Sequence, residues 1–437
     1  MMNNETQTKK APKPWMSFED QLQLLKARGM QVDDDAAALD YLERIGYYRL
    51  SGYWYPMRQI DKEESERQKA PVRSDRFLPG SRFEDAVRLY VFDKKLRLLA
   101  LDALERIEMA VRVDVAHTLG KRAPRAHEHA SHLDGAFTRK KNNGASEHER
   151  WLKKYRTQLT NSRRTTLVNH HQKVYGSLPV WVAIEIWDFG MLSKMYAGMK
   201  HGDREHIAKI YGIENSKTFS QWLRSLNFIR NVCAHHGRLW NINVLELSNV
   251  PKEWSQFGLK KERPFFYFCL MQRLLQIICP NSSWGQRFRD LLEEFPEPEN
   301  KAMKLEDFGA VSEWRSIPIW EKPDAQKRTA AYPPKEEEAA VILEPMMEES
   351  ITIVKPSAPT TSQKQTSGTI PHLQPDTPRQ TATPCCRPHT EPCPSSPPGN
   401  TNIFNDLHQR ASNHAEGATD GDDRQRQPPA AGRSHSH

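Results

Sequence analysis

The chain has 437 residues, of which 27% are charged and 37% hydrophobic, and its mean hydropathy is −0.76. It contains no apolar run of about 18 residues, and its polar start lacks the apolar core of a secretion signal, so neither a membrane span nor export is expected. The 63 Lys and Arg exceed the 55 Asp and Glu only modestly, which permits a polyanionic partner without requiring one. The six cysteines form no CxxC pair, so no disulfide scaffold or zinc site is expected, and a reducing cytoplasm fits best.

Composition divides the chain into a body and a tail. All eleven tryptophans precede residue 325, whereas 16 of the 30 prolines follow it. Residues 326–437 hold one Phe and one Tyr, too few apolar side chains to offset the entropy of ordering, so we expect a disordered Pro-rich tail. The tail has 11 basic and 13 acidic residues, which leaves the positive charge on the body. We therefore expect a flexible N-terminus over 1–14, a folded body over 15–325 and a disordered tail over 326–437.

Helical periodicity predicts that the body is all-α. Apolar residues at spacings of three and four predict one long helix, or two in series, over 83–119. The same pattern predicts shorter helices over 17–28, 33–45, 151–160, 180–197, 203–211, 217–235, 264–278 and 284–295. Residues 46–56 are interpreted as irregular because they contain two glycines, 61–75 as a charged loop, and 120–150 as an exposed polar insertion. No strand-like alternation lasts more than four or five positions.

Residues 225–241 carry the candidate chemistry. On the helix predicted there, Asn227, Asn231 and His235 recur every four residues and share one polar face. Arg230 lies beside this face, and Gly237 is expected to end the helix. The pattern predicts a basic, titratable cluster at a helix C-terminus, where the helix dipole favours a protonated imidazole. The members of the cluster are Arg230, His235, His236 and Arg238.

Such a cluster suits RNA cleavage. An imidazole can take or give the proton of a ribose 2′-hydroxyl, and a guanidinium can hold the phosphate oxygens as charge develops. The 2′-oxygen is the nucleophile, so no metal is needed, and the products are a 2′,3′-cyclic phosphate and a 5′-hydroxyl. An Arg followed by a His at similar spacing also occurs at Arg112/His117, Arg122/His127 and Arg164/His170. Spacing alone therefore leaves open a second interpretation, a solvated polar helix end.

Four ordered motifs resemble the Abi-like family, the AbiD/AbiF type of abortive infection proteins. Residues 230–241 (RNVCAHHGRLWN) are similar to the family signature, and residues 46–54 (GYYRLSGYW) are similar to its N-terminal aromatic motif. Residues 104–108 (LERIE) with Arg112 resemble its central helix, and residues 178–190 (LPVWVAIEIWDFG) resemble the segment before the signature. The resemblance covers about residues 15–295 and leaves out the tail.

The resemblance implies a place in the HEPN superfamily, whose members are helical and include many metal-independent RNases. It implies a HEPN-like bundle over about 83–295, preceded by additional N-terminal helices, with no cofactor and no metal. Arg230, Asn231 and His235 match the superfamily's catalytic motif, and His236 is an alternative to His235. Upstream helices of the superfamily often supply an acidic residue, so Glu185 and Asp188 are further site candidates. The competing interpretation makes both of them helix-surface charges.

The expected partners are RNA, as substrate or regulator, and a second copy of the chain, because HEPN RNases usually build one site from two facing motifs. An antitoxin or regulatory RNA is a further possible partner, and no membrane partner is expected. Three functions compete: an RNase toxin that blocks phage spread, a non-catalytic RNA-binding or RNA-regulated module of a defence or toxin–antitoxin system, and a structural protein of a defence operon. Two sets of aromatic residues are expected to pack in the core rather than stack on bases. They are Tyr47, Tyr48, Tyr53 and Trp54 in the first motif, and Trp181, Trp187 and Trp222 further along.

Overall fold

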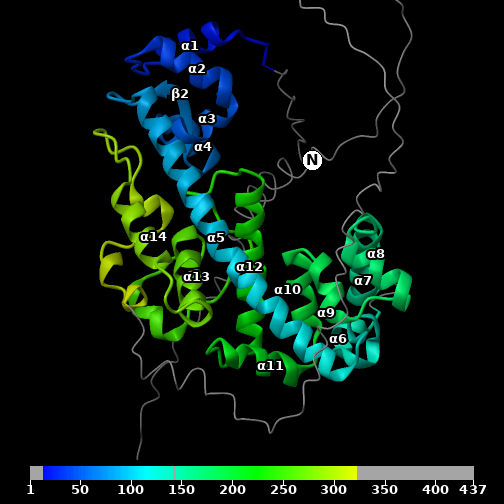
Figure 1. Ribbon diagram of the computed structural model, residues 1–437. Coiled ribbons are helices and arrows are strands. Elements are labelled where there is room, and N and C mark those ends of the chain that lie inside the picture. The colour runs from blue at the N-terminus through cyan, green and yellow to red at the C-terminus, as the bar shows by residue number, and fades with distance from the viewer. Residues whose placement is uncertain (1–12, 141–143, 322–437) are drawn as a thin grey trace, which may run out of the picture. The chain divides into compact units, whose positions relative to one another are not determined.

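The computed structural model describes residues 13–140 and 144–321, which are mainly helical (Figure 1). The α-helices of this part are α1 Phe18–Ala27, α2 Asp35–Ile45, α3 Tyr47–Trp54, α4 Lys62–Gln68, α5 Phe83–Arg122, α6 Gly135–Thr138, α7 Glu147–Asn161, α8 Thr166–Tyr175, α9 Val180–Ala183, α10 Phe189–Gly198, α11 His201–Ile210, α12 Ser216–Ala234, α13 Pro264–Ile278 and α14 Trp284–Glu293. The all-α prediction is confirmed. The predicted tail lies outside the described residues, as do residues 1–12 of the predicted flexible N-terminus.

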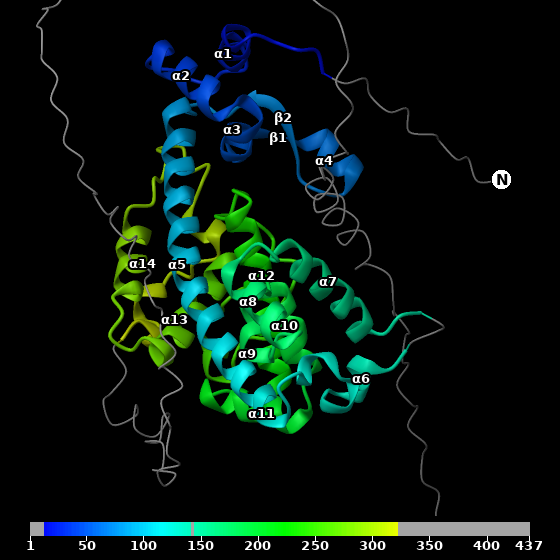
Figure 2. The same ribbon diagram turned by 45° about the vertical axis from the view of Figure 1, so that its right-hand side comes forward.

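The 40-residue helix α5 connects the other elements (Figures 1 and 2). At 1.5 Å per residue it is about 60 Å long. Glu84 and Asp85 lie in its first turn, and Lys121 and Arg122 lie in its last, an arrangement that stabilises the helix dipole at both ends. It packs against α3, α9, α12, α13 and α14. The long periodic segment is therefore one helix, and no helix of the described residues is long and apolar enough to cross a membrane.

Helices α12 and α13 pack on α5 and bring large apolar side chains into a shared core. The first eight residues of α13, from Pro264 to Met271, are all buried, as expected of a helix that is apolar on every side. Trp187 and Trp222 are fully buried, as predicted. The prediction for Trp181 is wrong, because its side chain is 51% exposed. Its ring covers α5 at Gly120, where an added Cβ would lie 3.2 Å from the indole.

Two N-terminal interpretations are wrong. Residues 47–54 are the helix α3 and not an irregular stretch, because Gly46 takes the positive φ at the helix start. The segment predicted as a charged loop contains α4, which is capped by the Asp61 carboxylate, and the strand β2 Val72–Phe77. This strand pairs antiparallel with β1 Arg58–Asp61, so the pairing partner lies before the charged helix and gives no local signal.

Two later predictions also need correction. The region 120–150 is not simply an exposed insertion, because His127 is buried against Tyr155 of α7, and His148 of α7 is buried against Phe137. The helix predicted over 180–197 is broken into α9, a short 3-10 turn at 184–186, and α10, which begins after Asp188. The Asp188 side chain accepts the Met191 N–H at 2.8 Å, so it caps a new helix instead of lying within an old one. Helix α8 was not predicted.

Candidate functional site

Helix α12 positions the candidate motif at its C-terminal end. Its buried face is formed by Phe219, Leu223, Leu226, Ile229 and Cys233. Asn231 lies partly exposed on the other side, Arg230 lies partly exposed at the edge of the buried face, and His235 follows as the residue that ends the helix. The backbone of His235 stays near the helical path, with φ −91° and ψ 17°. The predicted polar face therefore continues through His235.

The helix ends in a tight turn that uses His236. The His236 N–H donates to the Cys233 carbonyl at 3.1 Å, and the Gly237 N–H donates to the Val232 carbonyl at 2.7 Å. This pairing is the Schellman motif, which requires one left-handed residue. That residue is His236, with φ +57°, and not Gly237. The predicted position of the helix end is confirmed, but the residue that bends the chain is a histidine.

Helix α3 holds this turn from the other side. The Arg49 guanidinium donates to the His236 carbonyl at 2.7 Å. The Arg238 guanidinium donates to the Gly52 carbonyl, and a Cβ at Gly52 would lie 2.9 Å from the Arg238 Nη1 atom. Arg238 thus points into the protein and leaves the predicted exposed cluster. The first aromatic motif and the signature are therefore in direct contact, although they are separated by about 185 residues.

A buried carboxylate on α5 closes the contact. Asp93 is inaccessible to solvent and accepts hydrogen bonds from the Tyr53 hydroxyl at 2.7 Å and from the Arg97 guanidinium. The backbone N–H groups of Leu239, at 3.1 Å, and Trp240, at 2.7 Å, also donate to it. A carboxylate with this many donors joins α3, α5 and the chain after α12 at one point. Tyr53 and Trp54 of α3 are buried, as predicted, whereas Tyr48 is 73% exposed.

Burial sets the electrostatics of this network. It raises the pKa of the Asp93 carboxyl, and the Arg97 guanidinium opposes that rise together with the hydrogen bonds from Tyr53, Leu239 and Trp240. Burial also lowers the pKa of the Arg238 guanidinium. Burial of the Cys233 thiol raises its pKa, which keeps the thiol protonated and removes it as a nucleophile.

The other candidate residues, Arg230, Asn231 and His235, are not held by contacts with the rest of the described chain. Arg230 donates a long hydrogen bond of 3.3 Å to the side-chain oxygen of its neighbour Asn231. Within residues 13–140 and 144–321, Arg230 forms no ion pair, and the exposed His235 side chain forms no hydrogen bond or ion pair. A guanidinium, an amide and an imidazole are therefore available together at one helix end.

The structure does not bring the two acidic candidates into contact with this group. Glu185 lies 4.0 Å from Arg112, which also binds Glu108 and the Trp187 carbonyl. Asp188 pairs with Lys154 at 2.5 Å. Asp188 does lie near the polar face of α12, since a Cβ at Gly190 would be 3.2 Å from its carboxylate and 3.5 Å from the Asn227 amide.

Two of the three alternative Arg–His pairs differ from Arg230 and His235. Arg112 and Arg122 are bound by carboxylates, Arg122 through two hydrogen bonds to Asp203. The His127 side chain is fully buried, so the pair Arg122/His127 offers no imidazole at the surface. Arg164 and His170 are exposed, on and just before α8. Among the described residues, no group of three or more His, Cys, Asp or Glu side chains is arranged to hold a metal ion.

Sequence reasoning missed Asp93, Arg97, Tyr53 and Arg49 as parts of this region. The signal for Asp93 and Arg97 was present, because both fall on the periodic apolar face of α5, where an unpartnered charge is costly. Such a pair predicts that buried donors come from elsewhere in the chain. It does not say that they come from residues 239 and 240.

Comparison with known proteins gives one family match. The family model described as Abi-like protein matches residues 40–241, which run from α2 past the end of α12. No curated protein and no solved structure matches the chain. The matched region includes α3, Asp93 and the whole candidate motif, so it contains both sides of the contact described above. Over these residues the chain is similar to the Abi-like family.

Proposed function

We propose that this chain is an abortive-infection endoribonuclease of the HEPN superfamily that acts in phage defence. The proposal rests on the different use of the polar residues at the end of α12. Arg238 and the His236 carbonyl are used to hold the turn, whereas Arg230, Asn231 and His235 remain open to a ligand. The family match supports a role in defence, and the chemistry of the three open residues supports RNA as the substrate.

In the proposed reaction, the His235 imidazole takes the proton of a ribose 2′-hydroxyl. The freed 2′-oxygen attacks the adjacent phosphorus, and the bond to the 5′-oxygen breaks. Arg230 binds the phosphate oxygens as their charge grows, and Asn231 orients Arg230. The products are a 2′,3′-cyclic phosphate and a 5′-hydroxyl. The RNA supplies its own nucleophile, so the reaction does not require a metal-activated water.

His235 is favoured over His236 as the catalytic histidine. His235 continues the face of Asn227 and Asn231, while His236 turns away into the left-handed conformation with its carbonyl bound by Arg49. The departing 5′-oxygen needs a proton from a second group. A second copy of the chain, with its own His235 facing the same phosphate, supplies that acid, so we propose a homodimer as the active form.

The test is cleavage of single-stranded RNA by the full chain and by single variants. His235→Ala and Arg230→Ala are each expected to lower the cleavage rate by roughly 10²–10⁴. Arg230→Lys is expected to restore little, because an ammonium does not reproduce the two-pronged guanidinium. His201→Ala, which changes an exposed histidine of α11, is the matched control and is expected to keep the wild-type rate.

Three results would contradict the proposal. They are cleavage that requires a divalent metal, cleavage of DNA, which lacks the 2′-hydroxyl, and full activity of the double variant of His235 and His236. Thermal midpoints equal to that of the wild type would show that the inactive variants remain folded. Full activity of a strict monomer, measured by light scattering at the assay concentration, would refute the composite site alone.

A further inference from the structure

Helices α7 and α8 form a basic region, in which acidic residues occur only in the first turn of α7, at Glu147 and Glu149. From Arg150 to Ile184 the sequence contains no Asp or Glu, although 55 of the 437 residues are acidic. The same stretch contains seven basic residues: Arg150, Lys153, Lys154, Arg156, Arg163, Arg164 and Lys173. All of them are exposed. A long segment with one sign of charge raises the local concentration of a polyanion.

The aromatic inner face of α7 fixes the direction of these charges. Trp151 and Tyr155 are buried, and the Trp151 indole N–H donates to the Met191 carbonyl of α10 at 3.0 Å. Trp151 also packs edge-on against Trp187, with 4.8 Å between ring centroids. Because the two rings anchor one side of α7, Lys153 and Arg156 lie on its solvent side.

Most of these cations have no partner in the protein. Arg150 pairs with Glu147, and Lys154 pairs with Asp188. The other five form no ion pair with any residue in 13–140 or 144–321, and they are Lys153, Arg156, Arg163, Arg164 and Lys173. Elsewhere many arginines are bound by carboxylates, for example Arg122, Arg287 and Arg315. Five unpaired cations, three on α7 and α8 and two in the turn between them, match a ligand with repeated negative charge.

Rings and polar groups on α8 favour RNA over other polyanions. Tyr175 is 66% exposed, and its ring lies 5.6 Å from that of His171, so both can stack on bases. Asn169 and Gln172 add amide groups for phosphates or 2′-hydroxyls. Helix α8 also exposes Leu167 and Val174. Two aliphatic residues on a ten-residue helix give little apolar area for membrane binding.

The charged helices connect to the motif helix through α10. Lys154 of α7 binds Asp188 at the start of α10, and Asp188 lies beside Gly190 together with Asn227 of α12. Asn227 is one helical turn before Asn231 on the polar face that ends in His235. The Lys154 side of α7 therefore lies near the polar face of α12.

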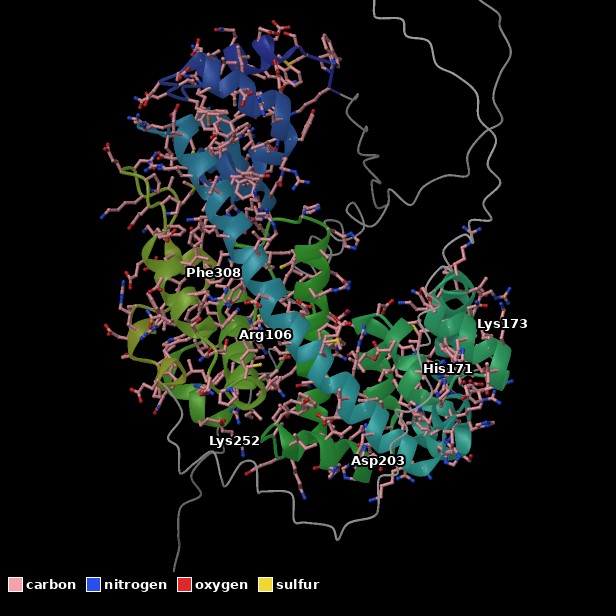
Figure 3. The ribbon with its side chains drawn as sticks, in the orientation of Figure 1. Arg106, His171, Lys173, Asp203, Lys252 and Phe308 are labelled. Atoms are coloured by element: carbon pink, nitrogen blue, oxygen red, sulfur yellow. The ribbon has the colours of Figure 1, made fainter. Side chains whose placement is uncertain are left out.

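We propose that α7 and α8 form a binding surface for the phosphate backbone of single-stranded RNA. The proposal deepens the proposed function, because RNA is the substrate class chosen there. It makes Arg163, Arg164 and Lys173 binding residues that act on affinity and not on the chemical step. Figure 3 shows Lys173 and His171 on α8, well apart from Lys252, which supplies the control below.

The test measures RNA affinity in the full chain that carries His235→Ala, so that the RNA is not consumed. The probe is a fluorescein-labelled single-stranded RNA of about 20 nucleotides, titrated at several salt concentrations. The triple substitution Arg163→Gln, Arg164→Gln and Lys173→Gln is expected to weaken binding at least about tenfold at low salt. It is also expected to lower the slope of log affinity against log salt by about 2, because each lost single-strand contact removes about 0.7.

The control carries Lys252→Gln, Lys260→Gln and Lys261→Gln, which remove the same charge from three exposed lysines elsewhere. Its affinity and salt slope are expected to match those of the parent. Equal binding by the two triple variants would overturn the surface and leave the proposed RNase intact. No RNA binding by the parent, or binding only to vesicles of anionic lipid, would also overturn it. If the α7–α8 substitutions weaken binding but the wild type cuts no RNA, the surface stands and the catalytic proposal fails.

Discussion

The residues of the signature before His236 and those after it lie in different environments. After His236, the Arg238 side chain and the N–H groups of Leu239 and Trp240 are turned inward and bound by α3 and Asp93. Before it, the Arg230 and Asn231 side chains are partly exposed and the His235 side chain is exposed. Polar residues that stand close together in one motif thus divide into a structural group and an open group. A sequence motif alone does not show this division, because all of its members are equally polar.

The largest expected effect lies in the buried half. Asp93→Ala removes the partner of Arg97 and leaves a buried guanidinium uncompensated, so the free energy of unfolding is expected to fall by about 3–5 kcal/mol. Urea denaturation monitored by circular dichroism measures the loss. Asp40→Ala, which breaks the exposed pair with Arg44 on α2, is the control and should cost less than about 1 kcal/mol. Equal losses for the two variants would remove the distinction between the halves.

A second buried polar group, the His127 imidazole, is expected to make the free energy of unfolding depend on pH. Burial among aromatic rings lowers the pKa of His127 to about 4, and the nearby Glu128 opposes this only in part. Since the folded pKa lies below the unfolded value of about 6.5, the unfolded state binds more protons between these pH values. The contribution of His127 to the free energy of unfolding is therefore present above pH 6.5. It is lost as the pH falls toward 4, by about 3 kcal/mol in total.

The matched variant for this prediction is His127→Phe, which keeps an aromatic ring and removes the titration. The free energy of unfolding is measured by urea denaturation at several pH values. The variant should lose less stability than the wild type between pH 6.5 and 4, whatever its absolute stability. Parallel curves for the two proteins would show that His127 does not titrate in this window.

A smaller effect tests the link between α3 and Asp93. Tyr53→Phe removes the hydroxyl that donates to the carboxylate, so the free energy of unfolding should fall by about 1.5–3 kcal/mol. Tyr55→Phe, two residues later, removes a partly exposed hydroxyl that makes no hydrogen bond with the described residues and should be nearly neutral. A neutral Tyr53→Phe would mean that the remaining donors satisfy Asp93 without α3.

The smallest expected change in stability belongs to the open half. Arg230→Ala and His235→Ala should each leave the free energy of unfolding within about 0.5 kcal/mol of the wild type, because neither side chain is bound by the core. The same urea titrations give the values. A loss above about 2 kcal/mol would show that these residues support the fold, and their proposed catalytic role would lose its main argument.

Local sequence patterns predicted much of the fold. Helices α5, α12 and α13 follow from their apolar residues, because α5 and α12 bury an apolar face and α13 buries all of its first eight residues. Helix α3 was not predicted because a glycine such as Gly52 normally disfavours a helix. The reason for a glycine at this position is the close approach of Arg238, which lies 186 residues away in the sequence. Strand β2 was missed because its partner β1 is separated from it by α4.

The candidate site, like the fold, could be predicted only in part. The shared face of Asn231 and His235 comes from helical spacing alone. The loss of Arg238 to the interior, the left-handed His236 and the contact with Arg49 all depend on tertiary contacts that no local pattern contains. The positions of Glu185 and Asp188 depend on the break between α9 and α10, which apolar periodicity does not mark.

The sequence separation within the Asp93 network has a consequence for folding during synthesis. Tyr53 lies 40 residues before Asp93, whereas Leu239 and Trp240 follow it by 146 and 147 residues. A growing chain can form the first contact while α12 has not yet been made, but the carboxylate gains its backbone donors only after residue 240 leaves the ribosome. Contacts of such long separation form late, because closing the loop costs entropy before any contact is gained. We therefore expect the turn that holds His235 to be among the last parts of residues 40–241 to become ordered in a newly made chain.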